Sequence, residues 1–553
     1  MIEDNKNEAL SAEKEYKTAY ESANEYIENF DILETITNVG NDEVFTPRKT
    51  CEMILDSLPE EVWHNPNYKW LNPATKNGIF EREIALRLDE GLKDIIPDIE
   101  KRRKHILQNM IFSIGQTRFT SNVARRTVYY CSQANRKCDG LKANDGHFVN
   151  GYAIGNGTWF NDEEGNIKTP NIAHTFKNGK CIFCGISENS KYNDKNQLET
   201  YAYEFIHFDN ENILKHLQDR FFGGNRNMKF DVIIGNPPYQ LNDGGGTGSS
   251  ATPIYNKFVE QAILLNPSYI SMIIPSKWFS GGKGLDDFRF KMLNDKHIKK
   301  LVDFENFKDV FPYVDLAGGA CYFLWNKKYS GDCFVTNKNS NETKTKIRKL
   351  NEFDFFIRSN EAVDIVKKIN LNSNKHISDF ISPRLPFGIS TTYKPLNSGV
   401  PCYFTQKIGL KYVDKKDIID DYNLIDKYKL LIPKAPIAGQ TDFSKPVMIY
   451  YEKNIILAKP NEICSESWLV AFASSDLKEV EGFKKYLLTK TFRFLLLQTL
   501  VSQNTSRKNF CFIPAFETYN FDINDDYLME KWKLNNDEKN LINSKIRNYG
   551  DTL

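Results

Sequence analysis

The feature that most constrains the fold is an alternation of short apolar runs and amphipathic segments between residues 50 and 330. The apolar runs, which predict strands, are residues 68–73, 109–115, 203–209, 230–235 and 269–276. Residues 79–92 and 254–265 lie between such runs and carry apolar side chains at helical spacing. Strands that alternate with helices predict an α/β fold with a mostly parallel, doubly wound sheet and helices on both faces. Ligands of such sheets bind at the carboxyl ends of the strands.

The chain has 553 residues, which is too long for one small domain. Its polar first segment predicts an N-terminal helical cap over residues 1–43. The alternating region predicts a domain over residues 44–330, interrupted at 128–195 by a cysteine-bearing insertion without sustained periodicity. Residues 331–553 contain short aromatic runs and no new alternation, which predicts a second domain of mixed α+β type.

Composition and charge exclude several classes of protein. Lysine plus arginine number 73 and aspartate plus glutamate 72, so the net charge of +1 lacks the basic bias of a protein whose whole surface binds nucleic acid. No run of about 18 apolar residues occurs, and the N-terminus is unlike a signal peptide, so we expect neither membrane insertion nor secretion. Ten cysteines are too few for a disulfide scaffold, and we expect a cytoplasmic protein.

The sharpest motif is Asn236-Pro237-Pro238-Tyr239, directly after the apolar run 230–235. Two prolines stop the strand and fix the backbone, because each locks φ and removes a donor. The asparagine oxygen and a proline carbonyl can then accept hydrogen bonds from one exocyclic amino group, while the tyrosine ring stacks on the base that carries it. An isolated N-P-P tripeptide is usually a turn, but the preceding strand and the following tyrosine favour a site that holds a planar amine.

Residues 231–239, D-V-I-I-G-N-P-P-Y, resemble motif IV of the S-adenosylmethionine-dependent amino-methyltransferases. The longer context, strongest from about residue 44 to 326, resembles the N6-adenine DNA methyltransferases of bacterial restriction-modification systems, with a gamma-like order of motifs. The resemblance implies a Rossmann-like methyltransferase sheet and S-adenosylmethionine as the cofactor. It also implies base flipping of the target adenine, with Asn236, Pro237, Pro238 and Tyr239 as catalytic residues.

The resemblance further implies a set of residues that contact the cofactor. Residues 45–47 resemble the F-T-P motif that precedes the sheet, and residues 72–80 resemble the first strand-to-helix turn, in which glycine lets the backbone approach a ligand. Asp209 matches the motif whose carboxylate accepts a hydrogen bond from the cofactor's adenine. The implied cofactor-binding residues are Phe45, Thr46, Pro47, Asn72, Pro73, Ala74, Gly78, Gln116, Asp209 and Asn236.

Asn72 and Gln116 depart from the family's pattern, and the roles of Gln116 and Asp209 each have an alternative. Asn72 stands where the family usually has aspartate, and Gln116 stands where most relatives have an acidic residue that binds the ribose. Either Gln116 makes a neutral contact with the ribose or the ribose is held elsewhere. The alternative for Asp209 is a solvated carboxylate at the end of the predicted strand 203–209.

A flipped base needs aromatic contact on both faces to offset the cost of unstacking. The segment Val310-Phe311-Pro312 resembles the later family motif in which a phenylalanine packs on the second face of the base. The resemblance therefore adds Phe311 to the catalytic residues, opposite Tyr239. The alternative places Phe311 in the ordinary apolar core.

The insertion at 128–195 carries a second cluster, Cys131-x6-Cys138 followed by Cys181-x2-Cys184-Gly185. A C-x2-C pair before glycine is typical of zinc sites, because the tight turn directs two thiolates at one tetrahedral ion. A long insertion without periodicity also needs a cross-link of its own that stabilises it. We therefore predict zinc bound by Cys131, Cys138, Cys181 and Cys184, with His174 as the substitute if one thiol is not a ligand. The alternative is four reduced cysteines without a shared role.

Together these residues predict a site-specific, adenine-specific DNA methyltransferase that modifies N6 in double-stranded DNA within a restriction-modification system. We expect residues 331–553 to be the DNA target-recognition domain, and a separate restriction endonuclease to perform any cleavage. The candidates for base or phosphate contact are Gln406, Lys407, Lys411, Gln503, Asn504, Arg507 and Lys508. One alternative is another amine acceptor, an RNA base or a protein glutamine. The other is a non-catalytic DNA-binding subunit.

Overall fold

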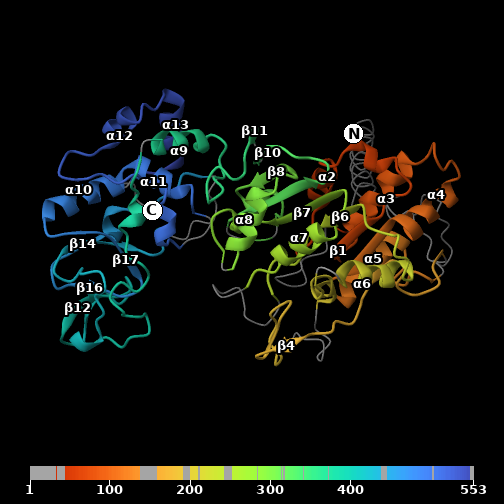
Figure 1. Cartoon of the computed structure of the whole chain (residues 1–553), viewed down its shortest axis with the longest axis horizontal. Coiled ribbons are helices and arrows are strands. Elements are labelled where there is room, and N and C mark those ends of the chain that lie inside the picture. The colour runs from red at the N-terminus through yellow and green to blue at the C-terminus, as the bar shows by residue number, and fades with distance from the viewer. Residues whose placement is uncertain are drawn as a thin grey trace, which may run out of the picture. The chain divides into compact units, whose positions relative to one another are not determined.

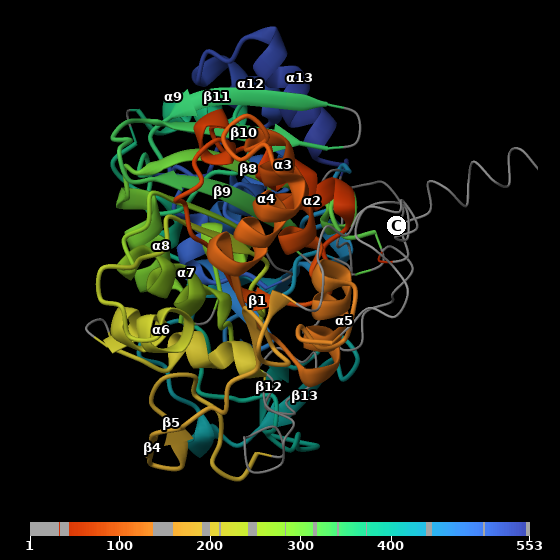
Figure 2. The ribbon, with the colours of Figure 1, turned by 90° about the vertical axis from the view of Figure 1, so that its right-hand side faces the viewer.

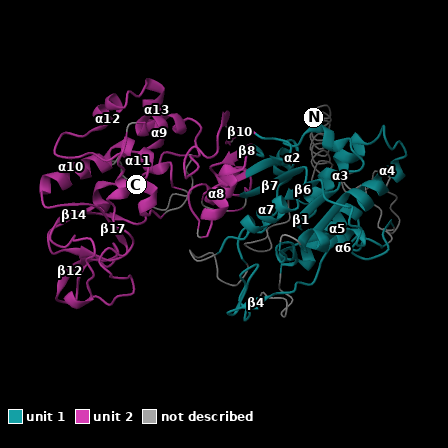
Figure 3. Cartoon of the chain, in the orientation of Figure 1, with its two compact units in different colours: residues 1–274, 297–299, 322–330 teal, residues 275–296, 300–321, 331–553 magenta. Residues whose placement is uncertain are grey.

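The computed structural model describes most of the chain, in two compact units (Figure 3). The described residues are 33, 44–136, 159–190, 200–209, 212–241, 252–282, 284–312, 314, 318–339, 342–371, 373–437, 445–500 and 504–548. Apart from Leu33, the predicted cap over residues 1–43 lies outside them. Unit 1 comprises residues 1–274, 297–299 and 322–330, and unit 2 comprises 275–296, 300–321 and 331–553. Two stretches that precede residue 330 in sequence are therefore part of unit 2.

The largest sheet has nine strands in the order β11-β10-β8-β9-β7-β6-β1-β2-β3. Figure 1 labels β11, β10, β8, β7, β6 and β1 of this sheet. The strands are β1 (Trp70–Thr75), β2 (Ile111–Gly115), β3 (Ile167–Lys168), β6 (Val232–Gly235), β7 (Tyr269–Pro275), β8 (Ile298–Phe304), β9 (Ala320–Asn326), β10 (Cys333–Lys338) and β11 (Thr343–Arg348). β1 pairs in parallel with β2 and β6, and β6 in parallel with β7. β10 pairs in parallel with β8 and antiparallel with β11. The predicted α/β class is confirmed, and the sheet is mixed.

Helices cover both faces of the sheet in unit 1. Figure 2 shows α3 and α5 on one side of β1, and α6 and α7 on the other. The helices of this unit are α2 (Arg48–Leu55), α3 (Ile79–Gly91), α4 (Ile99–His105), α5 (Arg118–Tyr129), α6 (Asn212–Phe222) and α7 (Tyr255–Leu264). The stripe predicted for the segment 79–92 is buried, because its four apolar members are each at most 3% exposed; they are Phe80, Ile84, Leu88 and Leu92.

β1 extends two residues past Pro73, where the sequence suggested that the strand ends. Trp70 pairs with Ile111 and Leu71 with Phe112 of β2, and the register shifts between Asn72 and Thr75. Proline cannot donate to a ladder, and it is tolerated within a strand where the pairing is irregular. The register shift therefore explains how β1 continues through the proline.

The predicted strand at 203–209 is wrong. Residues Tyr201–Ile206 form the 3-10 helix η7, and residues 202–206 are all buried. The outer edge of β2 is already paired with β3, through Ser113 and Ile167. Since that edge of β2 is occupied, the apolar run packs against the sheet instead of extending it.

Unit 2 contains two further sheets, each of three strands, ordered β13-β12-β16 and β15-β14-β17. Their strands are β12 (Val400–Tyr403), β13 (Leu410–Val413), β14 (Tyr428–Pro433), β15 (Ile456–Ala458), β16 (Ile463–Cys464) and β17 (Trp468–Ser474). The helices of the unit are α8 (Asp286–Asn294), α9 (Ala362–Asn370), α10 (Leu477–Leu488), α11 (Lys490–Leu497), α12 (Asp525–Lys531) and α13 (Asn536–Lys545). Aromatic rings pack closely in its core, for example Phe483 stacked on Phe472 at 4.8 Å. Among the described residues, no helix is both long and apolar enough to cross a membrane.

Candidate functional site

The Asn-Pro-Pro-Tyr segment follows the end of β6, a fully buried strand between β1 and β7. Residues 236–239 are all buried as well. Gly235, the last residue of β6, approaches β1 so closely that a Cβ atom there would lie 2.5 Å from Asn72 Oδ1. Glycine at this position therefore lets the start of the motif lie directly against the predicted cofactor turn.

Asn236 is held through its amide nitrogen. The side chain is 2% exposed, and its Nδ2 donates hydrogen bonds to the backbone oxygen of Val44 and to Thr46 Oγ1, each at 3.1 Å. Within the described part of the chain, its Oδ1 is buried and accepts no hydrogen bond. A buried acceptor without a partner costs free energy, which a ligand's donor would recover. The two hydrogen bonds of Nδ2 also fix the orientation of the side-chain amide and therefore the position of Oδ1.

The aromatic member of the motif, Tyr239, is 6% exposed and lies beside a buried lysine. Lys76 Nζ is 5.9 Å from the centre of the Tyr239 ring and donates to the backbone oxygen of Val44 at 2.9 Å. The segment that starts at Val44 is thus bound by both the predicted turn and the predicted amine clamp. Lys76 belongs to the turn, but no pattern in the sequence indicates its contact with Tyr239.

The predicted strand-to-helix turn has the expected glycine. Gly78 precedes α3 with φ +80°, a left-handed conformation that favours glycine. A Cβ atom there would lie 2.9 Å from Ala124 Cα, in the backbone of α5. Asn77 Oδ1 accepts a hydrogen bond from the backbone N–H of Ile79 at 3.3 Å, within the first turn of α3.

Asn72, which departs from the family's usual aspartate, has an internal role in this structure. Its Nδ2 donates to Glu81 Oε1 at 2.9 Å, and its Oδ1 accepts from the backbone N–H of Ala74 at 3.1 Å. Ser113 Oγ donates to the same Glu81 oxygen at 2.6 Å. Burial raises the pKa of Glu81, and the hydrogen bond from Ser113 partly opposes that shift. These contacts tie β1, β2 and α3 together beneath the turn, and the sequence motif did not indicate Glu81.

The remaining predicted cofactor residues differ in their surroundings. Phe45 and Thr46 are 8% and 4% exposed, and Pro47 is the N-cap of α2. Gln116 is 1% exposed and follows β2; its backbone N–H donates to Thr75 O at 2.9 Å. Pro73 and Ala74 lie within β1. Thr46, the end of β1 and Gln116 after β2 thus lie at the carboxyl ends of the strands, as Asn236 does after β6.

Asp209 and Phe311 are not linked to this group by the described contacts. Asp209 is exposed, and its Oδ1 accepts from the backbone N–H of Asn212 at 3.1 Å, at the start of α6. Phe311 belongs to unit 2, is 1% exposed and stacks on Phe307 with ring centres 4.7 Å apart. Their roles toward cofactor and base stay predictions.

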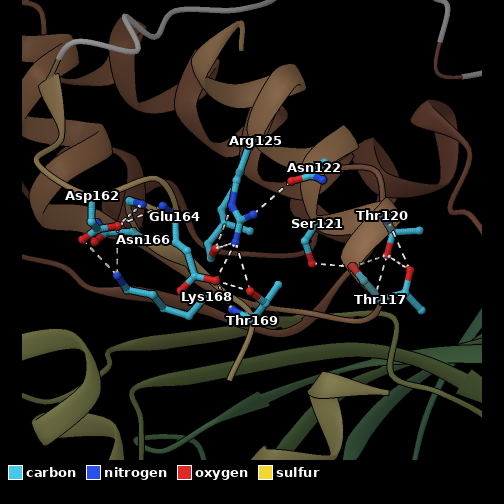
Figure 4. A network of polar contacts seen from close by, with 12 residues as sticks. Thr117, Thr120, Ser121, Asn122, Arg125, Asp162, Glu164, Asn166, Lys168 and Thr169 are labelled. Carbon is cyan, nitrogen blue, oxygen red and sulfur yellow. Dashed lines mark hydrogen bonds and ion pairs between the residues drawn. The ribbon is translucent and has the colours of Figure 1, made fainter. Parts of the chain in front are cut away.

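A polar network holds the edge strand β3 against α5 (Figure 4). Arg125 donates from Nε and Nη2 to the backbone oxygen of Ile167, at 3.1 and 2.7 Å, and from Nη2 to Glu164 at 3.0 Å. Thr117 caps α5 by accepting from the backbone N–H of Thr120 at 3.2 Å. The insertion 128–195 is therefore anchored to the sheet and to α5 at β3.

Among the described residues, the structure brings together two of the four predicted metal ligands, Cys181 and Cys184. Cys138 lies outside the described residues, and Cys131 donates instead to backbone oxygens, including that of Gln133 at 2.6 Å. Cys181 and Cys184 are grouped with two histidines, His174 and His207, with one potential ligand atom from each residue within 4.8 Å of the others. Cys131 is not a member of this group. His207 could not be inferred from spacing, because it lies 23 residues after Cys184 and beyond the insertion.

Two comparisons of this sequence with known proteins found a match. A family profile described as Eco57I restriction-modification methylase matches residues 109–311. A protein of Mycoplasma pneumoniae described as an uncharacterized adenine-specific methylase is 46% identical over 354 residues, which cover 62% of this chain and 81% of that protein.

Among solved structures, the M protein of the type I restriction enzyme EcoKI matches with 13% identity and a TM-score of 0.30, over 53% of this chain and 48% of that chain. The type IIL restriction-modification enzyme MmeI, solved in complex with DNA, matches with 12% identity and a TM-score of 0.42, over 88% of this chain and 66% of that chain. The chain spans about half the length of the type I chains it matches.

Proposed function

Because the chain belongs to the Eco57I restriction-modification methylase family, we propose that it methylates the N6 amino group of adenine in double-stranded DNA. In this proposal it is the modification component of a restriction-modification system, and cleavage is left to a separate restriction endonuclease. The observation that carries the proposal is the buried Asn236 Oδ1, which accepts no hydrogen bond from the described residues. An exocyclic amino group is the kind of donor that this oxygen lacks.

The residues around the turn fit a nucleoside cofactor with a small electrophilic group. Gly78 takes a left-handed φ at the start of α3 and packs against the backbone of α5, and the turn residues Thr75, Lys76 and Asn77 beside it have buried polar side chains. We assign cofactor contact to the backbone of residues 72–78, to the segment 45–47 and to Gln116. S-adenosylmethionine, when bound, supplies a methyl group activated by its positively charged sulfur.

The clamp acts on the acceptor amine. Asn236 Oδ1 and the backbone oxygen of Pro237 accept hydrogen bonds from the two N6 hydrogens, which orients the amine and stabilises the positive charge that develops on it. Thr46 and Val44 hold the amide of Asn236 so that its oxygen cannot rotate away. Tyr239 stacks on one face of the flipped adenine. No general base is required before the amine acquires the methyl group.

The test is a methylation assay with the purified full chain. Unmethylated genomic duplex DNA, RNA and a protein extract are each incubated with S-adenosylmethionine that carries a labelled methyl group, and the products are analysed by nucleoside and amino-acid mass spectrometry. We expect labelled N6-methyladenine in the DNA alone. Label in glutamine or in RNA would replace the proposed acceptor. Calorimetric binding of S-adenosylmethionine without transfer to any acceptor would leave a protein that binds cofactor but is not this enzyme.

A further inference from the structure

The cysteine-bearing segment forms a compact hairpin before its second pair of cysteines. β4 (Phe176–Lys177) and β5 (Lys180–Cys181) are antiparallel and joined by Asn178 and Gly179, both with positive φ. Two such residues form the tight turn that matches the twist of a hairpin. Cys181 thus occupies a fixed position at the end of a strand.

The turn after β5 has the geometry of a metal knuckle. Gly185 has φ +84°, and its backbone N–H donates to the backbone oxygen of Cys181 at 2.9 Å. The backbone N–H of Cys181 donates in return to Ile186 at 2.9 Å. This turn places both thiols of the C-x2-C pair on one side of the loop, as a tetrahedral ion requires.

Two histidines complete the group from outside the knuckle. His174 Nδ1 is 3.7 Å from Cys184 Sγ, and His207 Nε2 is 4.0 Å from Cys181 Sγ. The two imidazole rings are 4.7 Å apart. Ligand atoms around a tetrahedral zinc ion are separated by roughly 3.3–3.8 Å, given bonds of about 2.0–2.3 Å. The group therefore needs only small shifts to hold an ion.

Burial and chemistry favour a metal over a chance cluster. Cys181, Cys184 and His207 are each at most 5% exposed, and His174 is half-buried. Four polar side chains would not usually converge in a buried place without a shared partner. Thiolate and imidazole are the ligands that zinc prefers, and two thiolates neutralise the charge of one Zn²⁺ ion. A redox-active cysteine pair would not need the two histidines.

From this geometry we infer that His174, Cys181, Cys184 and His207 form a structural zinc site that fastens the insertion to the core of unit 1. His207 directly follows η7, while the other three ligands belong to the insertion. Lys257 of α7 reinforces the junction by donating a hydrogen bond to the backbone oxygen of Phe183, inside the knuckle.

Hydrogen bonds of η7 connect the zinc site to the candidate active site. The backbone N–H of Tyr201, the first residue of η7, donates to Gln116 O at 2.8 Å, and Tyr203 Oη donates to Gln240 O at 3.5 Å. η7 therefore contacts both a predicted cofactor residue and the residue that follows Tyr239. Metal binding at His207 stabilises η7, and any effect of the metal on methylation rests on the proposed function.

The experiment measures metal in the purified full chain by elemental analysis. We expect about one zinc per chain in the wild type, and a decrease of tenfold or more in Cys181→Ser, Cys184→Ser and His207→Ala. Cys131→Ser is the matched control, because Cys131 is also a buried cysteine of the insertion but is not in the group. It should keep its full zinc content. Loss of zinc in Cys131→Ser, with zinc retained in His207→Ala, would overturn the ligand set.

Cobalt substitution keeps the test decisive if the variants do not fold. The wild type with Co²⁺ in place of zinc should show the intense visible bands of a tetrahedral site and thiolate-to-cobalt charge transfer for two thiolates. His207→Cys should retain the ion and increase the charge-transfer band by about half, for three thiolates instead of two. A six-coordinate spectrum, or wild-type protein that is folded and contains no zinc, would refute the site whether or not the chain methylates DNA.

Discussion

Asn236 is positioned through its amide nitrogen, which leaves its oxygen for a ligand. Its neighbour Asn72 differs, because its oxygen accepts from Ala74 and its nitrogen donates to Glu81. Two asparagines, one within β1 and one directly after the neighbouring strand β6, thus have different roles, the first structural and the second open to a ligand. The difference depends on which atoms are already hydrogen-bonded, and it leads to two predictions about single residues.

Asn236→Ala should reduce the methylation rate by about 100-fold or more, because the substitution removes a preorganised acceptor from the amine. Folding and affinity for S-adenosylmethionine should change little, as measured by circular dichroism and calorimetry. Thr46→Val removes one partner of Asn236 Nδ2 and leaves Oδ1 in place, so its loss of rate should be smaller than that of Asn236→Ala. Its affinity for S-adenosylmethionine, measured by calorimetry, reports separately on the cofactor contact proposed for residues 45–47. Full activity of Asn236→Ala would refute the clamp.

Glu81→Gln should change how stability depends on pH. Burial raises the pKa of Glu81 in the folded chain, so ionisation of this group destabilises the fold as pH rises from the ordinary carboxyl pKa of about 4.3 toward the raised value. Glutamine cannot ionise and still accepts from Asn72 and Ser113. Urea unfolding at a series of pH values should show the variant gaining stability relative to the wild type across that window. Parallel profiles for the two proteins would contradict the assignment.

At the scale of elements, the turn between β1 and α3 packs against α5. This close approach requires a glycine in the turn. Gly78 combines a left-handed φ with a distance of only 2.9 Å between the position a Cβ atom would take and the backbone of α5. Gly179, in the β4–β5 turn, has a similar φ of +72°, but no atom lies within 4 Å of its Cβ position. Substitution of Gly179 would therefore test backbone strain alone, whereas substitution of Gly78 would add a steric clash with α5.

Gly78→Ala should therefore cost about 2–4 kcal/mol of unfolding free energy, the sum of left-handed strain and displacement of α5. Gly179→Ala should cost about 1–2 kcal/mol, from strain alone. Urea denaturation of the full chain measures both, and calorimetry should show weaker cofactor binding in Gly78→Ala only. Equal stability losses would mean that α5 moves aside without cost.

At the scale of the whole molecule, we propose that the chemistry and the choice of DNA sequence belong to different parts of the chain. The clamp and turn belong to unit 1, and none of their residues can distinguish one DNA sequence from another. In unit 2, Gln406, Lys407 and Lys411 are exposed on or beside β12 and β13, whereas Gln503 lies outside the described residues. Arg507 is less available, because its guanidinium donates to the backbone oxygens of Ser378 and Asp379.

Exchanging residues 331–553 with those of a similar methyltransferase should transfer the methylated sequence, because groove contacts outside the chemical site must supply specificity. Methylated positions are mapped by modification-sensitive sequencing of genomic DNA. Lys407→Ala with Lys411→Ala provides the contrast: lost phosphate contacts would weaken binding to all sequences without changing the site. If the methylated sequence stays with residues 1–330, sequence recognition belongs there, and the insertion becomes the first region to test.

Local patterns in the sequence were enough to predict the α/β class, α3 with its buried stripe, and the strand that leads to the Asn-Pro-Pro-Tyr motif. Each depends on residues within one element, whose periodicity and proline content limit the backbone directly. The tertiary structure alone decided the rest, since it depended on partners far away in sequence. Residues 201–206 form η7, and β3 pairs with the edge of β2 that the predicted strand would have needed. Folding brings His207 to Cys181 and Cys184, and residues 44 and 46 hold the amide nitrogen of Asn236 while its oxygen accepts no hydrogen bond from the described residues.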